Sequence, residues 1–173
     1  MRVLVTGGAG YIGSALVKRL AEVGHEVMAL DDLSRGSYEH LRRLNLPSKP
    51  VLLVGDICDA DTLESVIRSA EHIDAVFHLA AIPGLKLCRR EPRRAVLVNV
   101  FGSYNVLEAA RKHDVERVVF TSSAAVYGDP EELPVPESHP TRPKNLYGVT
   151  KLLAEHLFMV YPELYGLATV VLR

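Results

Sequence analysis

The segment Tyr147-Gly148-Val149-Thr150-Lys151 places a phenol and an ammonium four residues apart. In a helix these two side chains lie on one face, one turn apart. An ammonium near a phenol stabilises the phenolate and lowers the pKa of the tyrosine, which can then exchange a proton with a substrate hydroxyl near neutral pH. The same spacing also occurs on ordinary solvated helix faces, so it indicates chemistry only in combination with other residues.

Hydroxyl and amide side chains upstream could belong to the same site. Thr121-Ser122-Ser123 closes a predicted strand at the edge of a sheet where ligands bind, and a serine there can orient the oxygen of the same substrate. Asn99 is a poor helix former inside a predicted helix, and its side chain could hold the lysine through a water molecule. These residues predict a proton-transfer site around Tyr147.

A glycine pattern follows the first predicted strand. The strand expected at 2–6, with the apolar run Val3-Leu4-Val5, leads into Gly7-Gly8-Ala9-Gly10-Tyr11-Ile12-Gly13 and then into an amphipathic helix. Glycines allow a tight turn and a close approach of the backbone to phosphates, and the N-terminus of the helix attracts the anion. We therefore expect the pyrophosphate of a dinucleotide here, with a plain strand–turn–helix as the alternative.

Acidic residues follow the next two strands. Asp31 would lie beside the adenosine ribose, where a carboxylate accepts hydrogen bonds from both hydroxyls and repels a 2′-phosphate, which favours NAD over NADP. Asp32 is the neighbouring candidate, whereas Arg35 could accommodate that phosphate. Asp56-Ile57 could contact the adenine or form a simple turn.

The elements that must position these residues alternate between strand and helix. We expect strands at 2–6, 25–30, 51–54, 74–79, 116–121 and 167–172, and helices at 11–24, from 37, at 59–70, 92–112 and 145–161. This alternation predicts an α/β fold with a doubly wound parallel sheet of about six strands and helices on both faces. Residues 129–144 hold five prolines, so we expect a long loop there that forms a wall or lid over the active site, with an exposed rigid loop as the alternative.

Composition excludes several classes of function. The chain has 173 residues, enough for one domain with a substantial core, and its net charge of −1 offers no basic surface for nucleic acid. No apolar run is long enough to span a bilayer, and the chain opens into a strand without a signal peptide. Two cysteines and seven dispersed histidines form no disulfide or metal pattern, so we expect no metal and a reducing cytoplasm.

Together these segments resemble the extended short-chain dehydrogenase/reductase family, and within it the UDP-glucose 4-epimerase group. The resemblance covers essentially the whole chain and also includes His78-Leu79-Ala80-Ala81 and the segment from Thr121 to Gly128. It implies a Rossmann fold, NAD as cofactor, and a catalytic triad of Ser123, Tyr147 and Lys151. It further implies that the cofactor-binding residues are Gly7, Gly10, Tyr11, Ile12, Gly13, Asp31, Asp32, Ser34, Arg35, Gly36, Asp56, Ile57, Leu79, Ala80, Ala81, Asn99, Ser122, Tyr147 and Lys151.

The reaction implied by this resemblance inverts C4 of a nucleotide-sugar, most simply a UDP-hexose, through a transient 4-keto sugar. Ser122-Ser123 stands where related 4,6-dehydratases carry Asp-Glu, which argues against loss of water. Pro83 stands where the best-known epimerases carry a lysine that contacts the cofactor. The alternatives are a non-catalytic NAD-binding module, or another nucleotide-sugar reaction such as decarboxylation or reduction.

Members of the family continue into a smaller C-terminal domain that binds most of the nucleotide-sugar. We therefore expect residues 1–173 to be an NAD-binding Rossmann domain without that part, which holds NAD but shows little or no turnover. The resemblance also implies a homodimer through helices at about 93–112 and 145–161. Its apolar surface is expected from Val96, Val100, Val106, Leu107, Leu152, Leu153 and Leu157.

Overall fold

The computed structural model describes residues 1–44, 46 and 50–173, and in this part of the chain six strands form one parallel sheet. The strands are β1 (Arg2–Thr6), β2 (Glu26–Asp31), β3 (Val51–Val54), β4 (Ala75–His78), β5 (Arg117–Thr121) and β6 (Ala168–Leu172). Their order is β3-β2-β1-β4-β5-β6, so the winding reverses between β1 and β4. This is the doubly wound Rossmann arrangement that the alternating sequence predicted.

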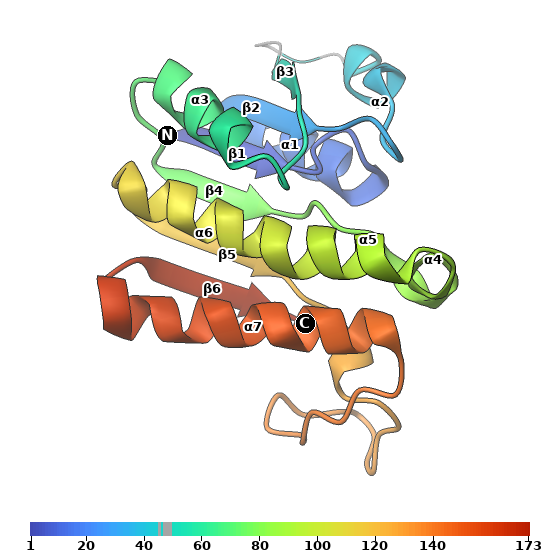
Figure 1. Cartoon of the computed structure of the whole chain (residues 1–173). Coiled ribbons are helices and arrows are strands. Elements are labelled where there is room, and N and C mark those ends of the chain that lie inside the picture. The colour runs from blue at the N-terminus through green and yellow to red at the C-terminus, as the bar shows by residue number, and fades with distance from the viewer. Residues whose placement is uncertain (45, 47–49) are drawn as a thin grey trace.

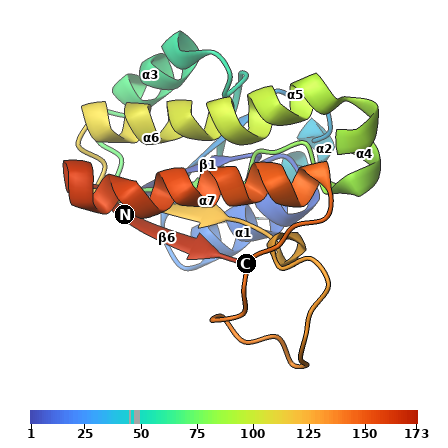
Figure 2. The same cartoon turned by 60° about the horizontal axis from the view of Figure 1, so that its bottom comes forward.

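Helices cover both faces of the sheet, with α3, α6 and α7 on one face and α1 on the other (Figures 1 and 2). The helices are α1 (Tyr11–Glu22), α2 (Tyr38–Arg42), α3 (Ala60–Ser69), α4 (Gly84–Arg90), α5 (Pro92–Val96), the π-helical η1 (Leu97–Gly102), α6 (Ser103–Lys112), the 3-10 turn η2 (Ala124–Val126) and α7 (Leu146–Tyr165). Each crossover returns the chain to the edge of the sheet where the strands begin, so all six parallel strands end at the opposite edge.

Two apolar cores lie on opposite faces of the sheet. In β1, Val3 and Val5 pack toward α1, whereas Leu4 packs toward α3, α6 and α7. All three side chains are at most 1% exposed. A strand buried on both faces is apolar at every position, which explains the uninterrupted run that precedes the glycine pattern.

The structure differs from the sequence-based expectation in three helices. Helix α4 was not predicted, and the expected helix at 92–112 is α5, η1 and α6 in series, with a π-helical middle. Helix α7 continues through Pro162 to Tyr165 and is followed by Gly166, whose φ is 71°. Pro162 lacks the N–H that would bond the carbonyl of Phe158, and the hydroxyl of Thr169 donates to that carbonyl instead, at 2.5 Å. The helix therefore continues past residue 161, where we expected it to end.

The apolar surface of the two long helices also differs from the prediction. Val106 and Leu107 are buried in the core, because they lie on the side of α6 that faces the sheet. Leu153 is exposed as expected, and Val96, Val100, Leu152 and Leu157 are partly buried. The other exposed apolar residues on these helices include Leu97, Phe101, Tyr104, Val149 and Val160. Within the described ranges, no helix is both long enough and apolar enough to cross a membrane.

A buried histidine joins β1, β4 and α6 beneath the strand ends. The Nδ1 of His78 lies 2.7 Å from the hydroxyl of Thr6, and its Nε2 lies 2.8 Å from the hydroxyl of Ser103. Because Ser103 donates its own proton to the carbonyl of Asn99, Nε2 carries the imidazole proton and Nδ1 accepts from Thr6. Burial lowers the pKa of His78 to about 3, and the nearby charge of Lys151 contributes a smaller part of this shift.

This histidine should make the fold sensitive to acid. His78 stays neutral in the folded chain down to about pH 3 but takes up a proton in the unfolded chain below about pH 6.5. The neutral His78 therefore contributes fully to the free energy of unfolding above about pH 6.5. This contribution is lost as the pH drops toward 3, and the loss is about 3 kcal/mol at pH 4.5. We expect urea titrations of His78→Gln to show lower stability at pH 7.5 but a flatter pH dependence. The exposed His156→Gln is the control, and an unchanged slope in His78→Gln would contradict the assignment.

Candidate active site

A cleft of about 400 Å³ opens where β1, β2, β4 and β5 end. A volume of this size is typical of small-molecule sites, and its position at the reversal of strand order is where doubly wound folds bind ligands. Most of the predicted site residues line it, and these are Gly7, Gly10, Tyr11, Ile12, Gly13, Asp31, Asp32, Ser34, Arg35, Gly36, Asp56, Ile57, Leu79, Ala80, Ala81, Ser122, Tyr147 and Lys151. The lining residues that sequence reasoning did not assign to the site include Leu30, Gly55, Ile82, Pro83, Val98 and Thr121.

The glycine loop forms the floor of the cleft. Gly7 has a φ of +70°, and a Cβ there would lie only 2.7 Å from the backbone nitrogen of Ala80. A Cβ at Gly13 would collide with the carbonyl oxygen of Gly7. Helix α1 begins just after Gly10, which gives it no side-chain cap, so its first N–H groups remain available. The loop thus forms a cradle for an anion that larger residues would fill.

Asp31 fastens the end of β2 to this cradle. Its side chain is buried, Oδ2 accepts from the backbone nitrogen of Ala9 at 3.0 Å, and Oδ1 accepts from that of Leu33 at 2.9 Å. Gly36 comes so close that a Cβ there would lie 2.8 Å from Oδ1. These bonds hold the carboxylate toward the cleft, and each oxygen keeps acceptor capacity for a ligand hydroxyl.

The start of α7 brings Tyr147 beside Ser123. Asn145 caps the helix by accepting from the backbone nitrogen of Gly148 at 2.9 Å. A Cβ at Gly148 would collide with the carbonyl oxygen of Ala125, so glycine is required for α7 to begin against η2. Burial raises the pKa of Tyr147, and a hydrogen bond with the hydroxyl of Ser123 opposes that rise.

Lys151 lies one turn further along α7 and is buried. Its Nζ donates to the carbonyl oxygen of Thr121 at 2.8 Å and lies 4.7 Å from the centre of the Phe120 ring. Burial lowers the pKa of Lys151 to about 8. We expected a lowered pKa at Tyr147, but burial is the largest effect there and raises that pKa above its ordinary value.

Two predicted residues do not line the cleft. Asn99 is 1% exposed and bonds the backbone nitrogen and oxygen of Ile82, at 2.7 and 3.1 Å, and the hydroxyl of Thr150, at 3.0 Å. Both amide hydrogens and one lone pair of Oδ1 are thus used within the protein, and Asn99 shapes the wall behind Ile82. Ser123 is half-buried beside the lining residue Tyr147, and its Oγ accepts from the backbone nitrogen of Ala125 at 3.2 Å.

A buried carboxylate that sequence reasoning missed supports this end of the site. Glu155 is fully buried, accepts from the hydroxyl of Ser122, and pairs with Arg173 through Nε at 3.1 Å and Nη2 at 2.8 Å. It lies one turn after Lys151, so spacing alone could have suggested it. The carboxylate ties the ends of β5 and β6 to α7.

The proline-rich loop does not form the expected wall over this cleft. Residues 129–144 form a loop that extends beyond the start of α7 (Figures 1 and 2). None of them lines the cleft. Pro130, Val135 and Glu137 instead line a second hollow of about 930 Å³, shared with Tyr127 and Arg173. The loop folds away because the buried His139 accepts from the backbone nitrogen of Glu131 at 3.0 Å, and its ring meets that of Tyr127 edge-on.

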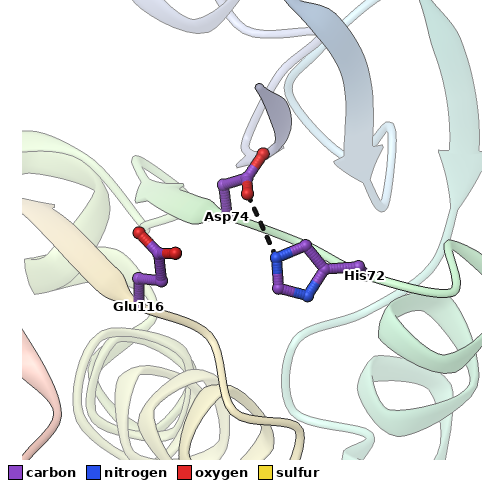
Figure 3. Close-up of side chains that lie close together, drawn as sticks. All are labelled: His72, Asp74 and Glu116. Atoms are coloured by element: carbon purple, nitrogen blue, oxygen red, sulfur yellow. Dashed lines mark hydrogen bonds and ion pairs between the residues drawn. The ribbon is translucent and has the colours of Figure 1, made fainter.

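A group of potential metal ligands lies at the opposite end of the strands (Figure 3). His72, Asp74 and Glu116 offer ligand atoms within 4.8 Å of one another. Both oxygens of Asp74 are already used, since one lies 3.1 Å from Nε2 of His72 and the other accepts from the backbone nitrogen of Arg2 at 2.6 Å. His72 and Glu116 are exposed. The group is far along the strands from the cleft, and the expected absence of a metal stays a prediction.

Comparisons with known proteins agree with this geometry. The profile of the NAD dependent epimerase/dehydratase family matches residues 3–173. A UDP-glucose 4-epimerase of Halalkalibacterium halodurans is 43% identical over 173 residues, which cover 100% of this chain and 50% of that relative. The chain therefore spans about half the length of the curated relatives it matches.

Solved structures of similar proteins also match this chain over about half of their own length. The UDP-glucose 4-epimerase of Thermus thermophilus in complex with NAD is 39% identical with a TM-score of 0.92, over 100% of this chain and 54% of that one. The UDP-glucose 4-epimerase of Thermotoga maritima with UDP-glucose is 35% identical with a TM-score of 0.92, over 100% and 55%. Because the family profile covers nearly the whole sequence, the chain belongs to the NAD dependent epimerase/dehydratase family.

Proposed function

We propose that this chain is the NAD-binding domain of a nucleotide-sugar 4-epimerase, with a UDP-hexose such as UDP-glucose as substrate. One observation carries the proposal: a single cleft joins the glycine cradle, the carboxylate of Asp31 and the pair Tyr147 and Lys151. A non-catalytic NAD-binding module would need the first two features but gains nothing from a buried lysine beside a tyrosine. Location in the cytoplasm stays a prediction.

The cradle and Asp31 fit the two ends of a dinucleotide. Residues 7–13 would hold the pyrophosphate against the first turn of α1, and Asp31 would accept from the ribose hydroxyls of the adenosine. The other end of the cleft leads to Tyr147, which would lie beside the nicotinamide. When bound, NAD would accept the hydride of the sugar and later return that hydride to it.

The side chains of α7 would move the proton that accompanies this hydride. Tyr147 would take the proton from the sugar 4-hydroxyl and give it back to the 4-keto sugar, and Ser123 would orient the oxygen. Lys151 is anchored on Thr121 and would stabilise the phenolate. With a pKa of about 8, the lysine is charged at neutral pH and loses its proton as the pH rises above 8.

The substrate assignment rests on the relatives and on one local feature. The Thermotoga maritima relative has been solved with UDP-glucose. Ser122-Ser123 supplies no acid and base for dehydration, because neither side chain carries a carboxyl group, and the hydroxyl of Ser122 is bonded to the buried Glu155. Another nucleotide-sugar reaction, such as decarboxylation or reduction, is the alternative, and we propose that the grip on the nucleotide lies in the part of the relatives that this chain does not match.

We further propose a homodimer through the outer faces of η1, α6 and α7. These helices lie side by side and expose Leu97, Phe101, Tyr104, Val149 and Leu153 (Figure 2). Removing such a surface from water stabilises a complex by about 25 cal/mol per Å² before the costs of association.

The cofactor assignment predicts a defined effect at Asp31. Loss of its carboxylate should weaken NAD binding about tenfold, since hydrogen bonds to the ribose are lost. It should also reduce the difference in affinity between NAD and NADP. Calorimetric titration of Asp31→Ala and Asp31→Asn with both dinucleotides measures this. The exposed Asp61→Ala is the control. Tighter binding of NADP than of NAD by the unmodified chain would refute the assignment.

The reaction is testable in a chimera of residues 1–173 with the remaining half of the Halalkalibacterium halodurans relative. We expect it to interconvert UDP-glucose and UDP-galactose at least a thousandfold faster than the chain alone, because positioning contributes much of the barrier reduction. Tyr147→Phe should lower the rate of the chimera about 10²–10⁴-fold, and Tyr165→Phe, at the far end of α7, should not. Equal rates for chain and chimera would contradict the need for the second half, and an active Tyr147→Phe would exclude the proton transfer.

The dimer proposal predicts a change in mass. Light scattering at micromolar concentration should give twice the chain mass for the unmodified protein and the single mass for Phe101→Glu, because a buried carboxylate without a partner is costly. Leu133→Glu changes an even more exposed apolar residue in the loop and should remain dimeric. A monomer at all concentrations for the unmodified chain would overturn this proposal.

A further inference from the structure

Charged side chains from two distant segments meet at the rim of the adenosine end of the cleft. Asp32 and Arg35 lie in the loop after β2, whereas Glu91 and Arg94 lie at the junction of α4 and α5. Arg35 Nη2 lies 2.7 Å from Glu91 Oε1, and Arg94 Nη2 lies 3.1 Å from Asp32 Oδ2. The two ion pairs thus cross between the same two segments.

Glu91 is the centre of this group. Besides Arg35 it contacts Arg90, at 2.9 Å, and Arg94, at 3.8 Å. Its side chain is 25% exposed, less than that of any of the three arginines, and the guanidinium groups hold its pKa below the ordinary value. Glu91 does not line the cleft, whereas Arg35 does. The carboxylate therefore lies outside the cleft and holds a cation that faces it.

Arg35 is the only cation among the described lining residues of the β2 loop, which otherwise contributes Asp31, Asp32, Ser34 and Gly36. A 2′-phosphate on the adenosine ribose would meet the two aspartates and needs a guanidinium in compensation. The guanidinium of Arg35 is instead paired with Glu91, and the charge of Glu91 adds to the negative field. The cleft therefore contains the arginine that a 2′-phosphate requires, and a carboxylate outside the cleft competes with that phosphate for its guanidinium.

We propose that Glu91 is a specificity-determining residue that excludes NADP by holding Arg35 away from the 2′-phosphate position. This inference rests on the proposed function, because it assumes that the cleft binds a nicotinamide dinucleotide. From the sequence alone, Arg35 is the residue that could accommodate the 2′-phosphate of NADP. Its pairing with Glu91, 56 residues away, is the reason why we do not expect it to do so.

The test is calorimetric titration of NAD and NADP into the unmodified chain, Glu91→Gln, Arg35→Ala and the double variant. Glu91→Gln should bind NADP about tenfold more tightly, the change expected for one charge-assisted hydrogen bond to a phosphate, and should bind NAD within about twofold of the unmodified chain. The double variant should lose the gain, and Arg35→Ala alone should show none. Glu132→Gln removes an exposed carboxylate from the proline-rich loop and is the control for net charge.

Each result separates this inference from the proposed function. Unchanged NADP affinity in a Glu91→Gln variant that still binds NAD overturns the role of Glu91 alone. A gain that persists in the double variant also overturns it, since the effect would then belong to Arg90 and Arg94. No binding of either dinucleotide by the unmodified chain overturns the proposed function and this inference with it.

Discussion

The whole site depends on how closely the backbone after β1 approaches the backbone after β4. At Gly7 any side chain would strike Ala80, and at Gly13 it would strike Gly7 itself. These two strands are the neighbours between which the sheet reverses its winding. The close approach therefore turns two strand ends into one continuous floor, and the first turn of α1 can present its N–H groups above it.

The strands and most helices could be predicted because each has a periodic or uninterrupted apolar pattern of its own. Helix α4 could not, since its seven residues carry no such pattern and Cys88 is held by the carbonyl of Ile82, a contact between neighbouring segments. Helix α7 runs beyond the predicted end at 161 for a similar reason: the hydroxyl that replaces the N–H missing at Pro162 comes from Thr169 on the next strand.

The same distinction, between local patterns and contacts of distant segments, applies to the site residues. Residues that lie together through local spacing, such as Tyr147 and Lys151, or through the shared edge of strand ends, such as Gly7 and Asp31, could be assigned from sequence. Spacing could not predict the contacts that determine the charge and burial of these side chains. The burial of Tyr147 and the pairing of Arg35 with Glu91 depend on packing between segments far apart in the chain. Asn99 was assigned to the cofactor because its polarity was visible and its three protein partners were not.

The central claim is that one cleft holds both ends of NAD, with the nicotinamide beside the proton-transfer residues. A crystal structure of the chain grown with NAD tests it most directly. We expect the pyrophosphate at residues 7–13, the adenosine ribose on Asp31, and the nicotinamide ring against Tyr147. A dinucleotide bound elsewhere, or bound in the cleft with its nicotinamide turned away from Tyr147, would contradict it.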